Sequence, residues 1–170
     1  MTRPHRLVTW ANAVVKSRWL DGAASVDAMS RPVRRLAAGF LDRFPHPADR
    51  ARAIQRAVRD RIRYTEDRPT MAGAMGEEFA SSDEILQRLT DDCDGKSRLF
   101  VALCRASGIE SRIRPVFSGP HFVHVQGEAR WPGSELEEKS QPGGWLLAEE
   151  IVRGVELGDD PTKIAHREIV

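Results

Sequence analysis

The sequence predicts an α+β domain in which helices come first and antiparallel strands follow. From the N-terminus to Gly108, apolar residues recur every three or four positions, which is the spacing of amphipathic helices. After Gly108 the period changes to alternation, as in 111-SRIRPVF-117 and 121-HFVHVQGEARW-131, which is typical of strands. Such a sheet must bury one face against a helix, and we expect the helix that begins near Cys93 to cover it.

Two helices are predicted in the first 47 residues. The stretch 7-LVTWANAVVKSRWL-20 has helical spacing, although its β-branched residues also permit a strand, and we interpret it as a helix. A second helix begins at Arg31, because Pro32 is tolerated in a first turn, and it ends at 44-FPHP-47. Its inward side chains should be Val33, Leu36, Ala37, Phe40, Leu41 and Phe44.

A third helix is expected from Ala48 to about Arg63, followed by Tyr64, the only tyrosine. Its inward side chains should be Ile54, Val58 and Ile62, and its outward arginine stripe should be Arg52, Arg56, Arg59 and Arg63. We expect Tyr64 to be a core aromatic residue beside a functional site or part of its lining. The stretch 65-TEDRPTMAGAMGEEFAS-81 is predicted to be a loop that helps to shape that site.

Two helices flank the acidic stretch 90-TDDCDGKS-97. The first, 82-SDEILQRL-89, is short, with Ser81 or Ser82 accepting hydrogen bonds from the free amides at its start and with Ile85, Leu86 and Leu89 facing inward. The second runs from Cys93 to about Ser107, and Gly108 ends it. The other cysteine, Cys104, lies in the same helix, too far along it to form a disulfide with Cys93.

The third predicted strand is 144-GWLLAEEIV-152, which a polar, glycine-containing segment separates from the second. With 170 residues and 41% hydrophobic residues, the chain suits one domain with its own core. We interpret 1–170 as a single domain that comprises a helical N-terminal extension (1–47), a core (48–158) and a tail (159–170).

The net charge is only +1, but it is unevenly distributed. Lys and Arg exceed Asp and Glu in residues 1–70, whereas the acids exceed the bases in 71–170. The basic helices either present a solvated face or bind an anionic partner, nucleic acid or an acidic protein. No apolar run approaches the length that crosses a bilayer, and the start lacks a secretion signal, so we expect a cytoplasmic protein with no membrane partner.

The position of Cys93 at a predicted helix start indicates an activated thiol. A helix N-terminus favours the thiolate and lowers the pKa of a cysteine. Asp91 and Asp92 oppose this by repulsion unless their carboxylates cap the helix amides. We interpret Asp94 as a first-turn cap and Lys96 as a solvated charge.

A cysteine nucleophile needs a base, and histidine is the natural one. Three of the five histidines lie in a terminal stretch, a proline turn and the tail: His5, His46 and His166. In an unbroken strand, residues three apart face opposite sides, so only one of His121 and His124 would face Cys93. We favour His124, which lies inside the strand, whereas His121 follows a Gly-Pro turn.

The group that orients this histidine should come from the neighbouring strand, where Trp145, Leu147 and Glu149 share one face. Glu149 is therefore the preferred carboxylate. Glu150 and Asp160 are the alternatives.

These residues resemble the transglutaminase-like superfamily, a branch of the papain-like cysteine enzymes. The similarity lies in 62-IRY-64, 92-DCDGKSRLFVALCRASGIESRIR-114, 124-HVQGEA-129 and 143-GGWLLAEE-150. The resemblance implies a papain-like fold with Cys93 as nucleophile, His124 as base and Glu149 in place of the family's aspartate. Compact members with a DCDGKS-like motif also look similar to proteins encoded in bacteriophage and prophage structural regions.

Three residues depart from the family pattern. Glu149 is one methylene longer than aspartate, Gln126 stands where the family often has tryptophan, and Asp92 stands where it usually has glycine. Because they adjoin the expected site, Asp92 and Gln126 are candidate substrate-binding residues together with Tyr64.

We therefore expect a peptidase or amidase that hydrolyses an amide bond of a protein or peptide through a Cys93 thioester, with a Cys-His-Glu triad. The alternatives are a cross-linking transglutaminase and a non-catalytic binding or assembly module, for example a phage structural protein. No cofactor is expected. A metal site formed by His121, His124 and Cys93 is not expected either, since His-x-x-His on an unbroken strand diverges.

Overall fold

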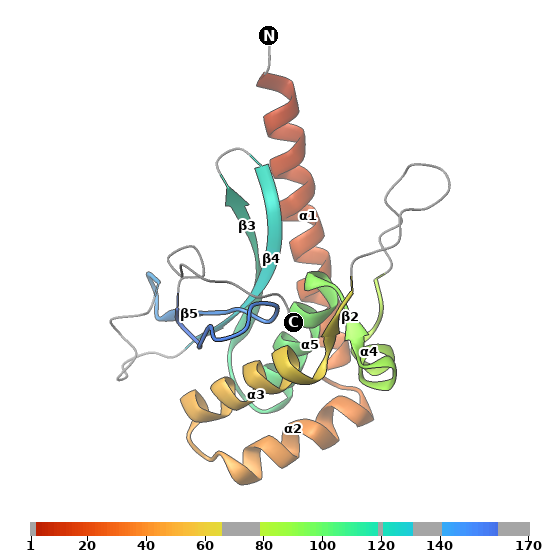
Figure 1. The fold of residues 1–170 in the computed structure, drawn as a ribbon, viewed down its shortest axis with the longest axis vertical. Helices are drawn as coiled ribbons and strands as arrows, with labels where there is room; N and C mark the ends of the chain where they lie inside the picture. Colours follow the sequence, from red (N-terminus) through yellow and green to blue (C-terminus); the bar gives the residue numbers. More distant parts are fainter. Residues whose placement is uncertain (1–2, 66–78, 119–120, 131–140, 160–170) are drawn as a thin grey trace.

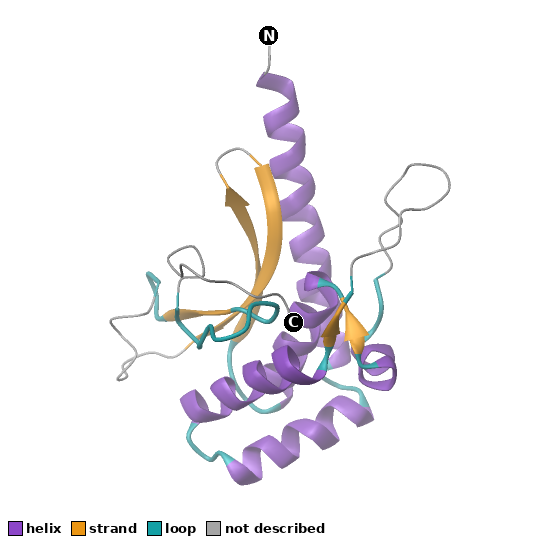
Figure 2. Ribbon diagram, viewed as in Figure 1, coloured by secondary structure: helices purple, strands orange, loops and turns teal. Residues whose placement is uncertain are grey.

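The structure is a computed structural model that describes residues 3–65, 79–118, 121–130 and 141–159 (Figure 1). This part of the chain forms an α+β fold, as the sequence predicts (Figure 2). Its helices are α1 (Arg3–Asp27), α2 (Arg31–Arg43), α3 (Pro47–Arg61), α4 (Ser82–Arg88) and α5 (Cys93–Ala106). Its strands are β1 (Arg63–Tyr64), β2 (Thr90–Asp91), β3 (Ser111–Ser118), β4 (His121–Arg130) and β5 (Trp145–Ala148). None of the described helices is long and apolar enough to cross a membrane.

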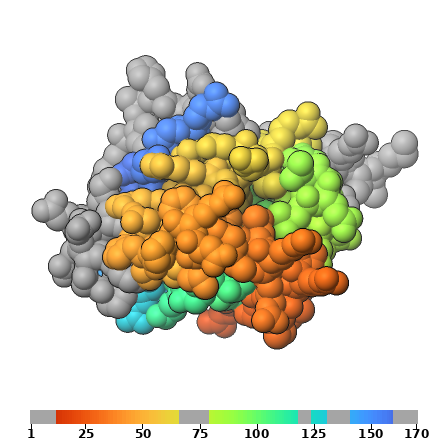
Figure 3. All heavy atoms as spheres, turned by 90° about the horizontal axis from the view of Figure 1, so that it is seen from below, coloured from red at the N-terminus to blue at the C-terminus, as the bar shows by residue number. Residues whose placement is uncertain are grey.

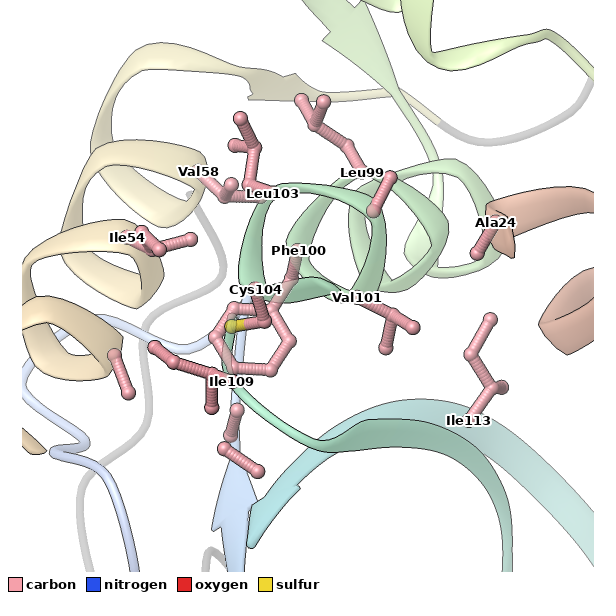
Figure 4. Close-up of a cluster of buried hydrophobic side chains, with 14 of the residues drawn as sticks. Ala24, Ile54, Val58, Leu99, Phe100, Val101, Leu103, Cys104, Ile109 and Ile113 are labelled. Carbon is pink, nitrogen blue, oxygen red and sulfur yellow. The ribbon is translucent and has the colours of Figure 1, made fainter. Parts of the chain in front are cut away.

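Helix α5 is the centre of the fold, because the four other helices and strands β3 and β4 all pack against it (Figure 1). Every side chain from Leu99 to Cys104 is buried. Figure 4 shows Phe100 and Cys104 pointing to the sheet side of α5, and Leu103 close to Val58 of α3. A helix that is apolar all round is one that is enclosed by other elements. The expectation that this helix covers the sheet is confirmed.

The three predicted strands form one antiparallel sheet in the order β3-β4-β5. The residues of β4 from His124 onward alternate between two faces. Val125, Gly127 and Ala129 face α5, and a Cβ added at Gly127 would overlap the ring of Phe100. The opposite face carries His124, Gln126 and Glu128.

A bulge interrupts β4 just before His124. Two consecutive residues of β3 pair with His124 and Phe122, so Val123 is an extra residue on β4. Bulges bend a strand and re-aim the side chains beside them. The expectation that His121 and His124 face opposite sides holds only for an unbroken strand. Because the bulge lies between these two residues, that expectation does not apply here.

The N-terminal helices α1 and α2 both contribute to the core that surrounds α5. The first predicted helix is confirmed, and Ala24 of α1 contributes to the core (Figure 4). In α2, Val33 is buried as predicted. Leu36 and Leu41 are 40% and 46% exposed, so the prediction that they face inward is wrong. The helical period was right, but the apolar stripe of α2 is wider than the surface that covers it.

Helix α3 buries Ile54 and Val58 on its inner side, as predicted. The predicted outward arginine stripe is broken at Arg59, which is buried and donates a 2.6 Å hydrogen bond to the backbone oxygen of Val155. Arg56 remains at the surface, where it forms a 2.7 Å ion pair with Glu156.

Helix α4 begins with a capping box. The Ser81 side chain accepts a hydrogen bond from the backbone amide of Glu84, and the Glu84 side chain accepts one from the backbone amide of Ser81. Ile85 is buried as predicted, but Leu89 ends the helix in a left-handed conformation (φ 54°) and is 51% exposed, so its predicted inward position is wrong. The chain then forms β2, which runs parallel to β1 and pairs Tyr64 with Asp91. This pairing brings the end of α3 beside the start of α5.

Candidate active site

Cys93 is the first residue of α5, and Asp92 is the cap of that helix. One carboxylate oxygen of Asp92 accepts hydrogen bonds from the backbone amides of Asp94 (2.9 Å) and Gly95 (3.2 Å). The prediction that an aspartate caps this helix is confirmed for Asp92. The backbone amide of Cys93 itself donates no hydrogen bond to any described residue. Within the described residues it is therefore an available donor at a helix start, where partial positive charge accumulates.

Asp91 holds the chain that enters the helix. Its carboxylate accepts a 2.9 Å hydrogen bond from the backbone amide of Asp92 and pairs with Arg88 at 2.5 Å. Gly95 packs directly on this carboxyl group, and a Cβ there would overlap it. Burial raises the pKa of Asp91, although Arg88 opposes the shift. The acids of the DDCDG motif thus build the helix start, and its glycine makes room for them.

The surroundings of Cys93 favour a neutral thiol. Burial raises the pKa of Cys93, and the charges of Asp94 and Asp92 raise it further. A hydrogen bond from the backbone amide of Val125 and the charge of Lys16 act in the opposite direction but are weaker. The expectation that the helix start favours a thiolate is therefore wrong for this resting structure, because burial and two carboxylates outweigh the helix terminus.

Two lysines beside Cys93 were not identified as site residues from the sequence. Lys16 of α1 pairs with Asp94 at 2.5 Å, while the Cys93 thiol lies 3.6 Å from the other oxygen of Asp94. Lys96 is fully buried and donates hydrogen bonds to the backbone oxygens of Arg59 (3.2 Å) and Ile62 (2.7 Å), near the end of α3. The interpretation of Lys96 as a solvated charge is wrong.

His124 of β4 and Glu149, which directly follows β5, lie next to each other. The Nε2 atom of His124 lies 3.5 Å from an Oε2 atom of Glu149, and their side chains are 14% and 3% exposed. Nε2 has no hydrogen-bond partner among the described residues, so the two side chains lie within ion-pair distance but do not have the geometry of a hydrogen bond. The other oxygen of Glu149 accepts a 2.9 Å hydrogen bond from the amide of Ile151, which fixes the carboxylate.

Glu150 points into the core. Its two carboxylate oxygens accept hydrogen bonds from the Ser97 hydroxyl (3.2 Å) and the Gly127 amide (3.3 Å), both in the core. Complete burial raises the pKa of Glu150, and the neighbouring Glu149 adds to this shift. Of the two adjacent glutamates, it is Glu149 that contacts His124. The third alternative, Asp160, lies outside the described residues.

The thiol and the imidazole approach the same part of β4. The backbone amide of Val125, the residue that follows His124, lowers the pKa of Cys93. Because Nε2 of His124 is turned to Glu149, Nδ1 is the nitrogen that remains for a thiol.

The candidate substrate-binding residues lie on three different segments. Tyr64 is half-buried and pairs with Asp91, two residues before Cys93. Gln126 shares the face of His124 and is only 2% exposed, and its Nε2 atom has no hydrogen-bond partner among the described residues. Asp92 is used as the helix cap.

Ligand atoms of Asp92, Cys93 and Asp94 lie within 4.8 Å of one another, as in some metal sites. The two carboxylates are already used, since Asp92 caps α5 and Asp94 pairs with Lys16. Their positions are thus explained by the fold. The side chain of His121 lies outside the described residues.

Comparisons with known proteins agree with this architecture. The sequence model of the transglutaminase-like superfamily matches residues 34–149, well over half of the chain. A solved structure of a candidate cysteine protease from Cytophaga hutchinsonii superimposes with a TM-score of 0.51 and 19% identity, over 70% of this chain and 36% of that one. A candidate protease from Parabacteroides distasonis gives a TM-score of 0.53 and 14% identity, over 78% of this chain and 29% of that one. At these identities the two structures show the fold alone, and this chain spans about a third of their length. No curated protein gave a significant match.

Proposed function

Because the chain belongs to the transglutaminase-like superfamily, a family of cysteine-dependent enzymes, we propose that it hydrolyses an amide bond of a protein or peptide through a thioester on Cys93. His124 is the base and Glu149 orients it. The observation that supports the proposal is the 3.5 Å contact between the His124 imidazole and the buried carboxylate of Glu149, next to Val125, whose backbone amide lowers the pKa of Cys93.

The raised pKa of Cys93 determines how the first step proceeds. Since the resting group is a thiol, its proton moves to Nδ1 of His124 as the sulfur attacks the carbonyl carbon of the substrate. The imidazolium that forms is stabilised by Glu149 at its other nitrogen. Nδ1 then donates the proton to the leaving amine, the C–N bond breaks, and an acyl thioester with Cys93 remains.

Water completes the cycle. His124 takes a proton from the water molecule, hydroxide adds to the thioester carbonyl, and the C–S bond breaks to release a carboxylic acid and the Cys93 thiol. The negatively charged oxygen in both steps is bound by the free backbone amide of Cys93 at the start of α5.

Gln126 is our candidate for binding the substrate beside this centre. The amide group of Gln126 is 98% buried, and its nitrogen has no hydrogen-bond partner among the described residues, which costs free energy. A carbonyl oxygen of the bound peptide would supply the missing acceptor. Tyr64, beside Asp91, would line the same end of the site.

The proposal is tested by incubating the protein with a pool of synthetic peptides, with and without a fluorescent primary amine, and analysing the products by mass spectrometry. We expect peptide fragments whose masses sum to that of the peptide plus one water, or glutamines converted to glutamate with release of ammonia, and none of these products from the Cys93→Ala variant. Cys104→Ala is the matched control, because it removes the other thiol of α5 from a fully buried position.

Incorporation of the amine in place of water would make the protein a cross-linking enzyme. Turnover that survives Cys93→Ala would overturn the role of the thiol. Absence of both turnover and a covalent peptide adduct on Cys93 would favour a non-catalytic binding module.

A further inference from the structure

A second feature lies on the opposite side of α5 from the sheet. Helices α2 and α3, which make up much of the face seen in Figure 3, border a groove of about 1090 Å³ together with α4. Leu99 and Leu103 of α5 lie at its base. The groove is separate from Cys93, His124 and Glu149, none of which lines it.

The walls of the groove are apolar and incompletely covered. On α2, Leu36 and Phe40 are four residues apart, which places them along one side of the helix, and Phe44, the residue that caps α2, also lines the groove. On α3 the corresponding residues are Ala53 and Ala57, whose small side chains leave space above them. Leu36 is 40% exposed, although it belongs to the helical period that would normally be buried.

The rim of the groove is positively charged. Each of its two carboxylates is already paired, Asp49 with Arg52 at 3.0 Å and Asp60 with Arg59 at 2.8 Å. Arg43 and Arg61 also line the groove, and neither forms an ion pair with any described residue. Two guanidinium groups without an ion pair in the described part of the chain therefore stand beside an apolar channel.

We propose that this groove binds an amphipathic helix of a partner protein, with leucine-like side chains against the groove and carboxylates beside Arg43 and Arg61. Helices commonly bind in this way, by laying an apolar stripe into a hydrophobic groove. The floor lies between two helices, where a flat lipid surface does not reach. A second copy of the same face would bring arginines against arginines, since α2 carries four arginines against one aspartate.

The test is an NMR titration of the full chain with a synthetic amphipathic peptide of about 20 residues, long enough to form a helix. Its apolar face carries leucines and its flanks carry glutamates. We expect shifts at Leu36, Phe40, Ala53 and Ala57, and we expect binding to weaken about ten-fold or more when Arg43 and Arg61 are both replaced by glutamate. Cys93→Ala should bind the peptide unchanged, because the groove does not involve the thiol.

Matched variants separate the groove from the general surface of α2. Leu36→Ser should weaken binding, whereas Leu41→Ser, on the same helix and 46% exposed but outside the groove, should not. Arg34→Glu is the corresponding charge control for Arg43.

Four results would overturn the proposal. They are equal binding of a peptide with lysines in place of glutamates, absence of binding by the acidic peptide, binding of phosphatidylserine vesicles that Leu36→Ser abolishes, and a dimer in sedimentation that the same variant dissociates. The last two would assign the groove to a membrane surface and to a second copy of the chain, respectively.

Discussion

The two faces of strand β4 differ in whether their buried polar groups have hydrogen-bond partners. Toward α5, the strand presents Val125, Gly127 and Ala129, and the buried carboxylate of Glu150 accepts hydrogen bonds at both oxygens there. On the other face, His124 and Gln126 are buried or nearly so, and each has an Nε2 atom without a hydrogen-bond partner among the described residues.

The difference lies in where polar groups are left unpaired. Further along the second face, Glu128 is fully buried yet paired with both Arg112 (2.5 Å) and Arg114 (3.1 Å). The unpaired atoms belong to residues 124 and 126, on either side of the residue whose amide lowers the pKa of Cys93. An unpaired buried polar group costs about 1–3 kcal/mol, so a substrate that binds as proposed above would lower this cost.

The core face should be the one that tolerates no added volume. Gly127→Val would place a side chain against the ring of Phe100 and an oxygen of Glu150, and we expect it to lower the free energy of unfolding by at least about 3 kcal/mol. Chemical denaturation measures this. Gly22→Ala on α1, where an added Cβ meets nothing within 4 Å, is the control and should be neutral or stabilising. A loss below about 1 kcal/mol in Gly127→Val would show that the two elements are not closely packed.

Lys96 connects α5 to the end of α3, and Lys96→Met should lower the free energy of unfolding by about 2 kcal/mol, since two backbone oxygens lose their donor. The pH dependence gives a second readout. Burial lowers the pKa of Lys96 to about 8 from 10.5, so between these values the unfolded chain binds more protons and the stability of the native protein rises with pH. This rise should be missing in Lys96→Met. An unchanged pH dependence would mean that the amine is solvated.

The two adjacent glutamates separate stability from activity. The pKa of Glu150 is raised, so its stabilising contribution is complete below about pH 4.5 and is lost as pH rises through its folded-state pKa. Glu150→Gln should therefore gain stability relative to the native protein as the pH rises, with Cys93 reactivity unchanged. Glu149→Gln should do the reverse, reducing reactivity with little change in melting temperature. Loss of Cys93 reactivity in Glu150→Gln would mean that Glu150, and not Glu149, is the carboxylate that supports activity.

The smallest effect concerns the charge beside the thiol. Asp94→Asn removes a carboxylate that raises the pKa of Cys93, and alkylation at pH 7 should become several-fold faster. Lys16→Met should make it slower, because Lys16 acts in the opposite direction. Equal pH–rate profiles of the three proteins would show that solvent screens both charges.

Periodicity was sufficient to predict the helices, the antiparallel strands and the helix that covers the sheet. It also contained one signal that was missed: Lys96 shares the helical stripe of Leu99, Phe100 and Leu103, and the structure buries it with them. Arg59 was misplaced because its partner, Val155, is remote in sequence. Strict alternation in β4 fails at the bulge, which no local pattern marks.

For the candidate site, the sequence supplied the residue types but not their protonation. Cys93 at a helix start, His124 on a strand and Glu149 near the end of the next follow from local patterns and from the family resemblance. The raised pKa of the thiol depends on burial against β4 and on Asp94, which only the tertiary structure reveals. The partner of Asp94, Lys16, comes from a helix that the motif does not include.

The most direct measurement is the rate of alkylation of the two cysteines by iodoacetamide at pH 7.5, followed by mass spectrometry of the folded protein. We predict that Cys93 is labelled while the fully buried Cys104 is not, and that His124→Ala slows the labelling of Cys93 about ten-fold or more. Unfolded protein, in which both cysteines react, is the positive control. A rate that His124→Ala leaves unchanged, or a Cys93 that reacts only after unfolding, would contradict the proposed Cys93–His124–Glu149 centre.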